Sequence, residues 1–300
     1  MPVTCGVGVL MKQLVARLTV TTVSCLTIAV AGGAGSGASA ALAGHDAVGA
    51  PNVSAPLPLP LRLHAAASKI SFSYNWAGYV QSAKKRNTFT GVTSTIFVTT
   101  VKTSVPGSQY SSDWVGIDGG NRRARSLVQA GVEEDNLGGT ASYYAWTEIL
   151  PAPEVPLGLV IGPGDEMTVS VRETAIDRWT MTVSDDSKKT SSSTTVSYAT
   201  PGVTVEAIHE RTCVTGFACA GTDFPPLATT TDETFEQAQF TSSPAGSTAA
   251  YSPLLAPVNG ATLSDVVMVA NRKTVLAIPS GPNGAENGFS VADGATPPPS

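Results

Sequence analysis

The feature that most constrains this chain is an alternation of hydrophobic and polar residues with a period of two. Met167, Val169 and Val171 alternate with polar residues, and the pattern returns over residues 179–183. Successive side chains of a β-strand point to opposite faces, so this pattern predicts half-buried strands. No segment of ten residues or more has the periodicity of an amphipathic helix. The sequence therefore predicts an all-β protein.

Further strands are expected over residues 92–101, 190–198, 203–208 and 265–270, which are short and in part rich in β-branched residues. Glycine, proline, asparagine and aspartate separate these runs at close spacing. Many short strands divided by turn residues are typical of a sandwich or barrel. A domain of about 220 residues favours a β-sandwich of two large antiparallel sheets.

Residues 1–43 have the layout of a signal peptide. Lys12 and Arg17 precede an apolar stretch of about 13 residues, which is shorter than the roughly 20 residues of a membrane helix. Small residues follow, so cleavage is expected after Ala40 or Ala43. We expect the protein to be secreted, with no stable membrane anchor after cleavage.

The rest of the chain divides into three parts. Residues 44–70 are rich in proline and alanine and are expected to be a linker or a pro-segment, 71–292 the folded domain, and 293–300 a disordered tail. After cleavage only Cys213 and Cys219 remain. In an oxidising compartment this spacing indicates a disulfide, because the partners of a zinc site are missing.

Charge and histidine content exclude several functions. The chain has 18 Lys and Arg against 23 Asp and Glu and a pI near 5.2, so no basic surface is expected to bind nucleic acid or anionic membranes. His209 is the one histidine of the expected domain, and it shares a strand face with Val203 and Val205, which favours a structural role. One histidine cannot form a His-based metal site. Phosphate-loop, nucleophile-elbow and dinucleotide motifs are missing, so we expect no metal and no cofactor.

Carboxylates remain as candidates for chemistry. Glu206 and Glu210 share one strand face, and such proximity raises the pKa of at least one of them. Trp146 and Glu148 share a face of the segment 144–150, as expected for the floor of a cleft. Each acid taken alone could instead be a solvated strand residue.

Five motifs in series carry a resemblance to a known family. They are residues 75–80 (NWAGYV), 114–119 (WVGIDG), 127–131 (LVQAG), 144–148 (YAWTE) and 205–210 (VEAIHE). Together these motifs resemble the glutamic peptidases, or eqolisins, which are secreted acid endopeptidases. The likeness spans about residues 72 to 240. It implies a sandwich of two seven-stranded antiparallel sheets, a concanavalin A-like jelly roll, with the cleft on a concave face.

The resemblance also implies the site. Gln129 and Glu206 fall on the catalytic positions of the family. Glu206 would take a proton from a water molecule that attacks the scissile carbonyl, and Gln129 would orient that water and donate to the developing oxyanion. The activity would need no metal and would suit acid conditions. The supporting positions are Trp76, Asp118, Trp146, Glu148 and Glu210.

This sequence departs from the family around the cleft. Tyr144 stands where the family has an acid, Ile149 and Leu150 replace two aromatic residues, and Ala207 stands where an aromatic residue is common. These changes concern substrate preference more than reaction type.

Two other functions stay open beside a peptidase. One is a carbohydrate-active sandwich that uses Glu148 and Glu206 as paired carboxylates, and the other is a relative that binds peptides without cleaving them. Gln129 distinguishes them, because a peptidase needs its amide within hydrogen-bond reach of Glu206 and a glycosidase does not. The expected partners are polypeptide substrates, and the expected state is a monomer.

Overall fold

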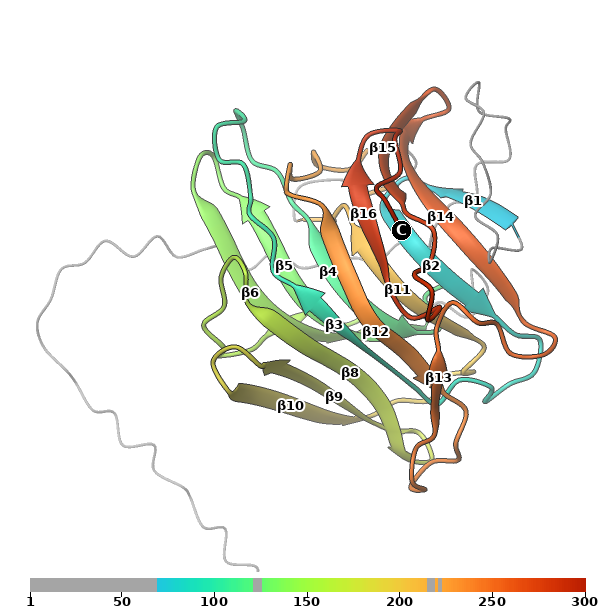
Figure 1. Ribbon diagram of the computed structural model, residues 1–300. Helices are drawn as coiled ribbons and strands as arrows, with labels where there is room; N and C mark the ends of the chain where they lie inside the picture. Colours follow the sequence, from blue (N-terminus) through green and yellow to red (C-terminus); the bar gives the residue numbers. More distant parts are fainter. Residues whose placement is uncertain (1–68, 121–125, 215–218, 221–222) are drawn as a thin grey trace, which may run out of the picture. The chain divides into compact units, whose positions relative to one another are not determined.

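The computed structural model describes residues 69–120, 126–214, 219–220 and 223–300 (Figure 1). The expected signal peptide, 1–43, and all but the last two residues of the expected linker, 44–70, lie outside these residues. Within the described part of the chain, every regular element is a β-strand. No helix there is long and apolar enough to cross a membrane. The all-β prediction is confirmed.

In the described residues, sixteen strands form two layers that pack face to face. Neighbouring strands of the first layer are, in order, β10 (Thr190–Ser197), β9 (Arg178–Asp185), β8 (Glu166–Ala175), β3 (Gly91–Phe97), β12 (Glu233–Thr241), β16 (Phe289–Asp293) and β15 (Thr274–Pro279). Those of the second layer are β14 (Thr262–Asn271), β2 (Trp76–Ser82), β11 (Thr204–Glu210), β4 (Ser112–Ile117), β5 (Val128–Asn136), β6 (Ala141–Ile149) and β7 (Val155–Pro156).

The two layers are also continuous with each other, because β15 pairs with β14. Pairing along this path is antiparallel throughout. Outside it, β1 (Lys69–Ser73) pairs in parallel with β14, and β13 (Tyr251–Pro253) pairs with β12. The predicted sandwich is therefore present, but its two sheets are joined into one continuous hydrogen-bonded sheet by the pairing of β14 with β15.

The alternation in the sequence produces the core between the layers. Met167, Val169 and Val171 of β8 are fully buried, while the intervening residues are partly exposed. On β11, Val205 and Ala207 belong to the same core. Strands β4, β5 and β11 contact β3, β8, β9 or β12 across it. Apolar area removed from water in this way is the main stabilising term of the fold.

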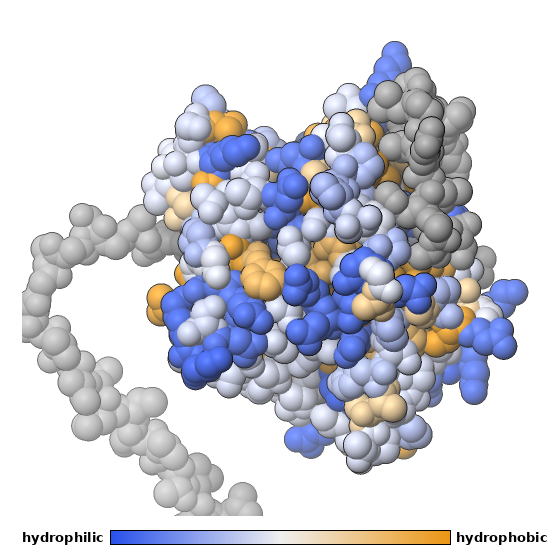
Figure 2. All heavy atoms as spheres, viewed as in Figure 1, coloured by the Kyte–Doolittle hydropathy of each residue, from blue (hydrophilic) through white to orange (hydrophobic). Residues whose placement is uncertain are grey.

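The outward face of the first layer carries the serine and threonine residues that fill the sequence. On β9 and β10, Thr182 and Ser193 lie 2.8 Å apart, and Thr180 and Thr195 lie 3.0 Å apart, Oγ to Oγ. Figure 2 shows that the face seen in Figure 1 is mostly hydrophilic, with small separate hydrophobic patches. The alternation thus separates a dry interior from a hydroxyl-rich exterior.

Candidate active site

Four residues of the second layer stand in one row across four adjacent strands. The register pairs Glu206 of β11 with Gly116 of β4, Gly116 with Gln129 of β5, and Gln129 with Glu148 of β6. Residues that are directly paired in a sheet project from the same face. The row therefore brings both residues expected to be catalytic, and one supporting residue, to a single face.

The glycine in this row leaves space between the two expected catalytic side chains. Glu206 and Gln129 are two strands apart, so their Cα atoms are separated by roughly 9.5 Å. A Cβ atom at Gly116 would lie 3.2 Å from Cβ of Gln129 and 2.9 Å from Cδ1 of Leu127. Any larger residue would therefore crowd the row, and glycine keeps the gap between Glu206 and Gln129 free of a side chain.

Gln129 does not bond directly to Glu206 in the described contacts. Its Nε2 donates to Oε2 of Glu148, which fixes the orientation of the amide. Oε1 of Gln129 and Oε2 of Glu206 are buried and make no hydrogen bond within the structure. The sequence predicted that Gln129 and Glu206 lie within hydrogen-bond reach of each other. Instead, one unbonded oxygen of each side chain lies on either side of a gap.

Glu206 is fully buried, and this burial raises its pKa to about 8. The backbone N–H of Gly120, which donates to Oε1 at 2.7 Å, and the nearby Thr204 hydroxyl oppose the rise. The charge of Asp118 adds to it. The sequence predicted a raised pKa from the neighbouring Glu210, but the main cause is loss of hydration.

Asp118 fixes the backbone that leads into β11. Its carboxylate accepts hydrogen bonds from Thr200 Oγ1 (2.5 Å) and from the backbone N–H groups of Gly202, Val203 (2.7 Å) and Thr204 (3.2 Å). Asp118 itself has φ of 82°, in the left-handed region that non-glycine residues rarely adopt. Such strain persists where surrounding contacts hold the backbone in place. Here the hydrogen bonds to Asp118 fix the start of the strand that carries Glu206.

Aromatic residues pack beside the row on the same face. Trp76 contacts Trp114 edge to face, with ring centroids 5.0 Å apart, and Trp146 belongs to the same hydrophobic cluster. Glu210 is held by two neutral donors, Asn75 Nδ2 at 2.8 Å and Trp114 Nε1 at 2.7 Å. Trp76, Trp146 and Glu210 thus lie on the same face as Glu206 and Gln129.

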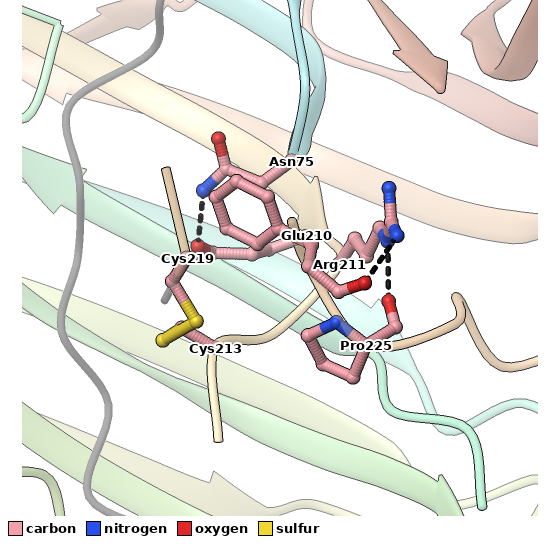
Figure 3. The surroundings of a disulfide bond; sticks show 7 residues. Asn75, Glu210, Arg211, Cys213, Cys219 and Pro225 are labelled. Carbon is pink, nitrogen blue, oxygen red and sulfur yellow. Dashed lines mark hydrogen bonds between the residues drawn. A yellow bond between two sulfur atoms is a disulfide. The ribbon is translucent and has the colours of Figure 1, made fainter. Parts of the chain in front are cut away.

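The predicted disulfide joins Cys213 and Cys219 just beyond the end of β11 (Figure 3). Next to it, the Arg211 side chain donates to the carbonyls of Phe224 (2.6 Å) and Pro225, and its backbone N–H donates to Asn75 O (2.7 Å). The chain that leaves β11 is therefore held both covalently and by hydrogen bonds.

The opposite face of the second layer carries a buried group of ionisable residues. His209 Nδ1 lies 2.9 Å from Asp113 Oδ1 and 3.9 Å from Glu233 Oε1. In the described part of the chain, these three are the group whose potential ligand atoms lie close enough together for a metal ion. Their polar atoms engage one another, and Thr230 Oγ1 donates to Glu233. This arrangement is a buried cluster of acids around one histidine, in which Asp113 Oδ2 and Glu233 Oε2 accept no hydrogen bond from an N–H or hydroxyl donor of the described residues.

Sequence reasoning missed the two glycines that shape the site. Gly116 provides the gap in the row, and Gly120 supplies the N–H that binds Glu206. A Cβ atom at Gly120 would lie 2.9 Å from Oε1 of Glu206. Their presence within and beside the WVGIDG motif was the available signal, because glycine is required where a backbone approaches another group closely.

The sequence profile of the Peptidase A4 family matches residues 74–279. Among solved structures, the chain is similar to scytalido-glutamic peptidase bound to a transition state analog inhibitor, with 20% identity, a TM-score of 0.57, and coverage of 73% of this chain and 98% of that one. It is also similar to SCP-B, a member of the Eqolisin family in complex with the tripeptide Ala-Ile-His, with 19% identity, a TM-score of 0.52 and the same coverages. No match is found among curated proteins.

Proposed function

The chain belongs to the Peptidase A4 family, and on that premise we propose that it is a secreted acid endopeptidase that uses Gln129 and Glu206. The observation that carries the proposal is the cross-strand row of Glu206, Gly116 and Gln129. It places a carboxyl group and an amide on either side of a gap, each with a buried oxygen that has no partner within the structure. A water molecule and a peptide carbonyl would satisfy those atoms.

The pKa of Glu206, about 8, decides its form at the start of the reaction. The sequence suggested an ionised base, but in acid this carboxyl carries its proton. Oε1 accepts from Gly120, so Oε1 is the carbonyl oxygen and Oε2 holds the proton. Oε2–H would protonate the scissile carbonyl oxygen while Oε1 takes a proton from the attacking water, so Glu206 is neutral before and after.

Collapse of the tetrahedral intermediate repeats this exchange. Glu206 gives a proton to the leaving nitrogen and takes one from a hydroxyl group of the intermediate, so the C–N bond breaks without a change in net charge. Gln129 would accept from the attacking water through Oε1 and donate through the second N–H of Nε2, since the first is bound to Glu148. A preorganised donor of this kind is commonly worth about 2.7–4 kcal/mol in the transition state.

The row also bears on the carbohydrate-active alternative. Glu148 and Glu206 are three strands apart, roughly 14 Å between Cα atoms, and Gln129 lies between them. A glycosidase needs its two carboxyl groups to face each other across the sugar, whereas here the Gln129 side chain projects from the strand position between the two acids. The hydrogen bond that the Gln129 amide donates to Glu148 further commits Glu148 to orienting the glutamine. These relations favour a peptidase.

Incubation of the purified protein with an unfolded protein substrate, from about pH 2 to about pH 8, tests the proposal. We expect cleavage in acid that neither pepstatin nor EDTA stops. Loss of cleavage with EDTA would contradict a metal-free mechanism. Binding of the substrate without any cleavage would instead identify a peptide-binding relative.

A further inference from the structure

Four ionisable side chains meet in the core between the two layers, on the face of the second layer opposite the candidate active site. Asp113 comes from β4, Glu134 from β5 and His209 from β11, all in the second layer, while Glu233 comes from β12 in the first layer. Asp113 and Glu134 are fully buried, and His209 and Glu233 are 1% exposed. We call these four residues the interlayer cluster.

The contacts within the interlayer cluster are mostly between carboxyl groups. Asp113 Oδ2, Glu134 Oε2 and Glu233 Oε2 receive no hydrogen bond from any N–H or hydroxyl donor in the structure. The carboxyls of Glu134 and Glu233 each lie within hydrogen-bonding contact of Asp113. Two carboxylates cannot hydrogen-bond to each other, but a carboxylic acid donates to a carboxylate. The contacts are therefore satisfied only when Glu134 and Glu233 carry protons.

The surroundings reinforce this requirement. Burial raises the pKa of both Glu134 and Glu233, and the charge of Asp113 raises it further. Opposing this, Thr99 N–H donates to Glu134 Oε1 at 2.7 Å, and Thr230 Oγ1 donates to Glu233 Oε1.

Other titratable groups around the cluster come from neighbouring elements. Tyr143 of β6 lies near both glutamates and has a raised pKa, mainly through burial. Asp293 of β16 lies near His209, and Lys102 and Asp232 lie near Asp293. In the described part of the chain, His209 is the basic group in contact with Asp113 and Glu233. One imidazole cannot neutralise three carboxylates.

We propose that the interlayer cluster is a pH-dependent latch, which holds β12 against β4, β5 and β11 in acid and releases it as the pH rises through neutrality. In acid, the protons shared with Asp113 link the two layers through hydrogen bonds in a dry core. When Glu134 and Glu233 ionise, the same contacts become repulsions between buried like charges. The inference goes beyond the proposed peptidase activity and does not depend on it.

Hydrogen exchange on the full-length protein, read strand by strand and corrected for intrinsic exchange, tests the latch. Between about pH 5 and about pH 8 the opening constant of β12 and β4 amides should rise at least tenfold, since one pKa unit corresponds to a factor of ten. In the double variant E134Q/E233Q, whose amides donate to Asp113 at any pH, this rise should fall below about twofold. The control E166Q changes an exposed acid of β8 outside the cluster and should keep the wild-type rise.

Two results would overturn the latch. One is an unchanged pH dependence of β12 in E134Q/E233Q. The other is protection of β12 and β4 by added Zn²⁺ at about pH 8, which would make the cluster a cation site. If the double variant does not fold, the single variants E134Q and E233Q test the latch. Each should raise the pH at which β12 opens, and an unchanged opening pH in both would overturn the proposal.

Discussion

At the scale of single residues, Glu206 and Gln129 lie on the two sides of a gap and have separate roles in the proposed mechanism. We predict that Glu206→Gln loses at least about 100-fold in turnover, and that Gln129→Ala loses about 100- to 1000-fold. The double variant should be little worse than either single one, because groups that act as a unit are not additive. Turnover of an unfolded protein substrate measures this. The control is Glu166→Gln, which changes an exposed acid of β8. Glu206→Gln with more than a tenth of the wild-type activity would refute the role of Glu206.

Gly120 offers a finer test of how Glu206 is oriented. In Gly120→Ala the new Cβ atom would meet Val80 Cγ1 at 2.6 Å and Glu206 Oε1 at 2.9 Å, so the carboxyl or the loop must move. We expect a lower kcat with the fold retained. The N–H contact lowers the pKa of Glu206. A weaker contact should therefore raise this pKa and shift the pH profile of activity to higher pH. Gly158→Ala is the matched control, because no atom lies within 4 Å of its Cβ position. Equal kcat in both variants would rule out this role for Gly120.

At the scale of elements, β11 is fixed at both ends. Asp118 binds the backbone at its start, and the disulfide closes a loop just after Glu210 at its end. The strand that carries Glu206 thus has little freedom to move along its axis. A small displacement of a reacting group is costly in rate, so these two anchors bear on catalysis as well as on stability.

We predict that the double variant Cys213→Ser with Cys219→Ser folds, is less stable by about 2–3 kcal/mol, and loses kcat more than substrate affinity. Short loops gain least from cross-linking, which sets this modest figure. Thermal melts and steady-state kinetics give the two effects. Mass spectrometry of the unreduced protein is the prior check, since two free thiols in the purified chain would remove the basis of the prediction.

At the scale of the whole domain, buried acids make stability depend on pH. Burial raises the pKa of Glu206 from 4.5 to about 8 and that of Asp265 from 3.8 to about 7. Such a group holds its proton in the folded state and loses it in the unfolded state between these values. The free energy of unfolding therefore falls as pH rises, by about 1.4 kcal/mol per pH unit for each group, from the unfolded to the folded pKa. We therefore predict that the fold is most stable in acid.

This dependence predicts a melting temperature that is highest in acid and declines toward about pH 8. Glu206→Gln should flatten part of the decline and melt above the wild-type protein near neutral pH, although it is inactive. Melting curves across the pH range, by circular dichroism, measure both. A wild-type melting temperature that rises from acid to neutral pH would show that the buried acids ionise without cost.

Local patterns carried much of this structure in the sequence. The period of two at Met167, Val169 and Val171 reports which side chains face a core, because strand geometry alone sets that alternation. The pairing of Cys213 with Cys219 was likewise predictable, because these two closely spaced cysteines are the ones that remain after the expected signal peptide. The motifs around Gln129 and Glu206 pointed to the family that the profile match confirms. Each of these signals lies within a stretch of a few residues.

Other features depend on strand register, which no local pattern encodes. Glu206 and Gln129 share a row only because β4 lies between β11 and β5 with Gly116 at the matching position. The interlayer cluster likewise forms only because Glu233 of β12, in the first layer, faces His209 of the second layer. The sequence determined which hydrophobic side chains of a strand share a face and which chemistry is available. The tertiary structure decided which of them meet, because long-range pairing sets the distances and the loss of hydration that give Glu206 its raised pKa.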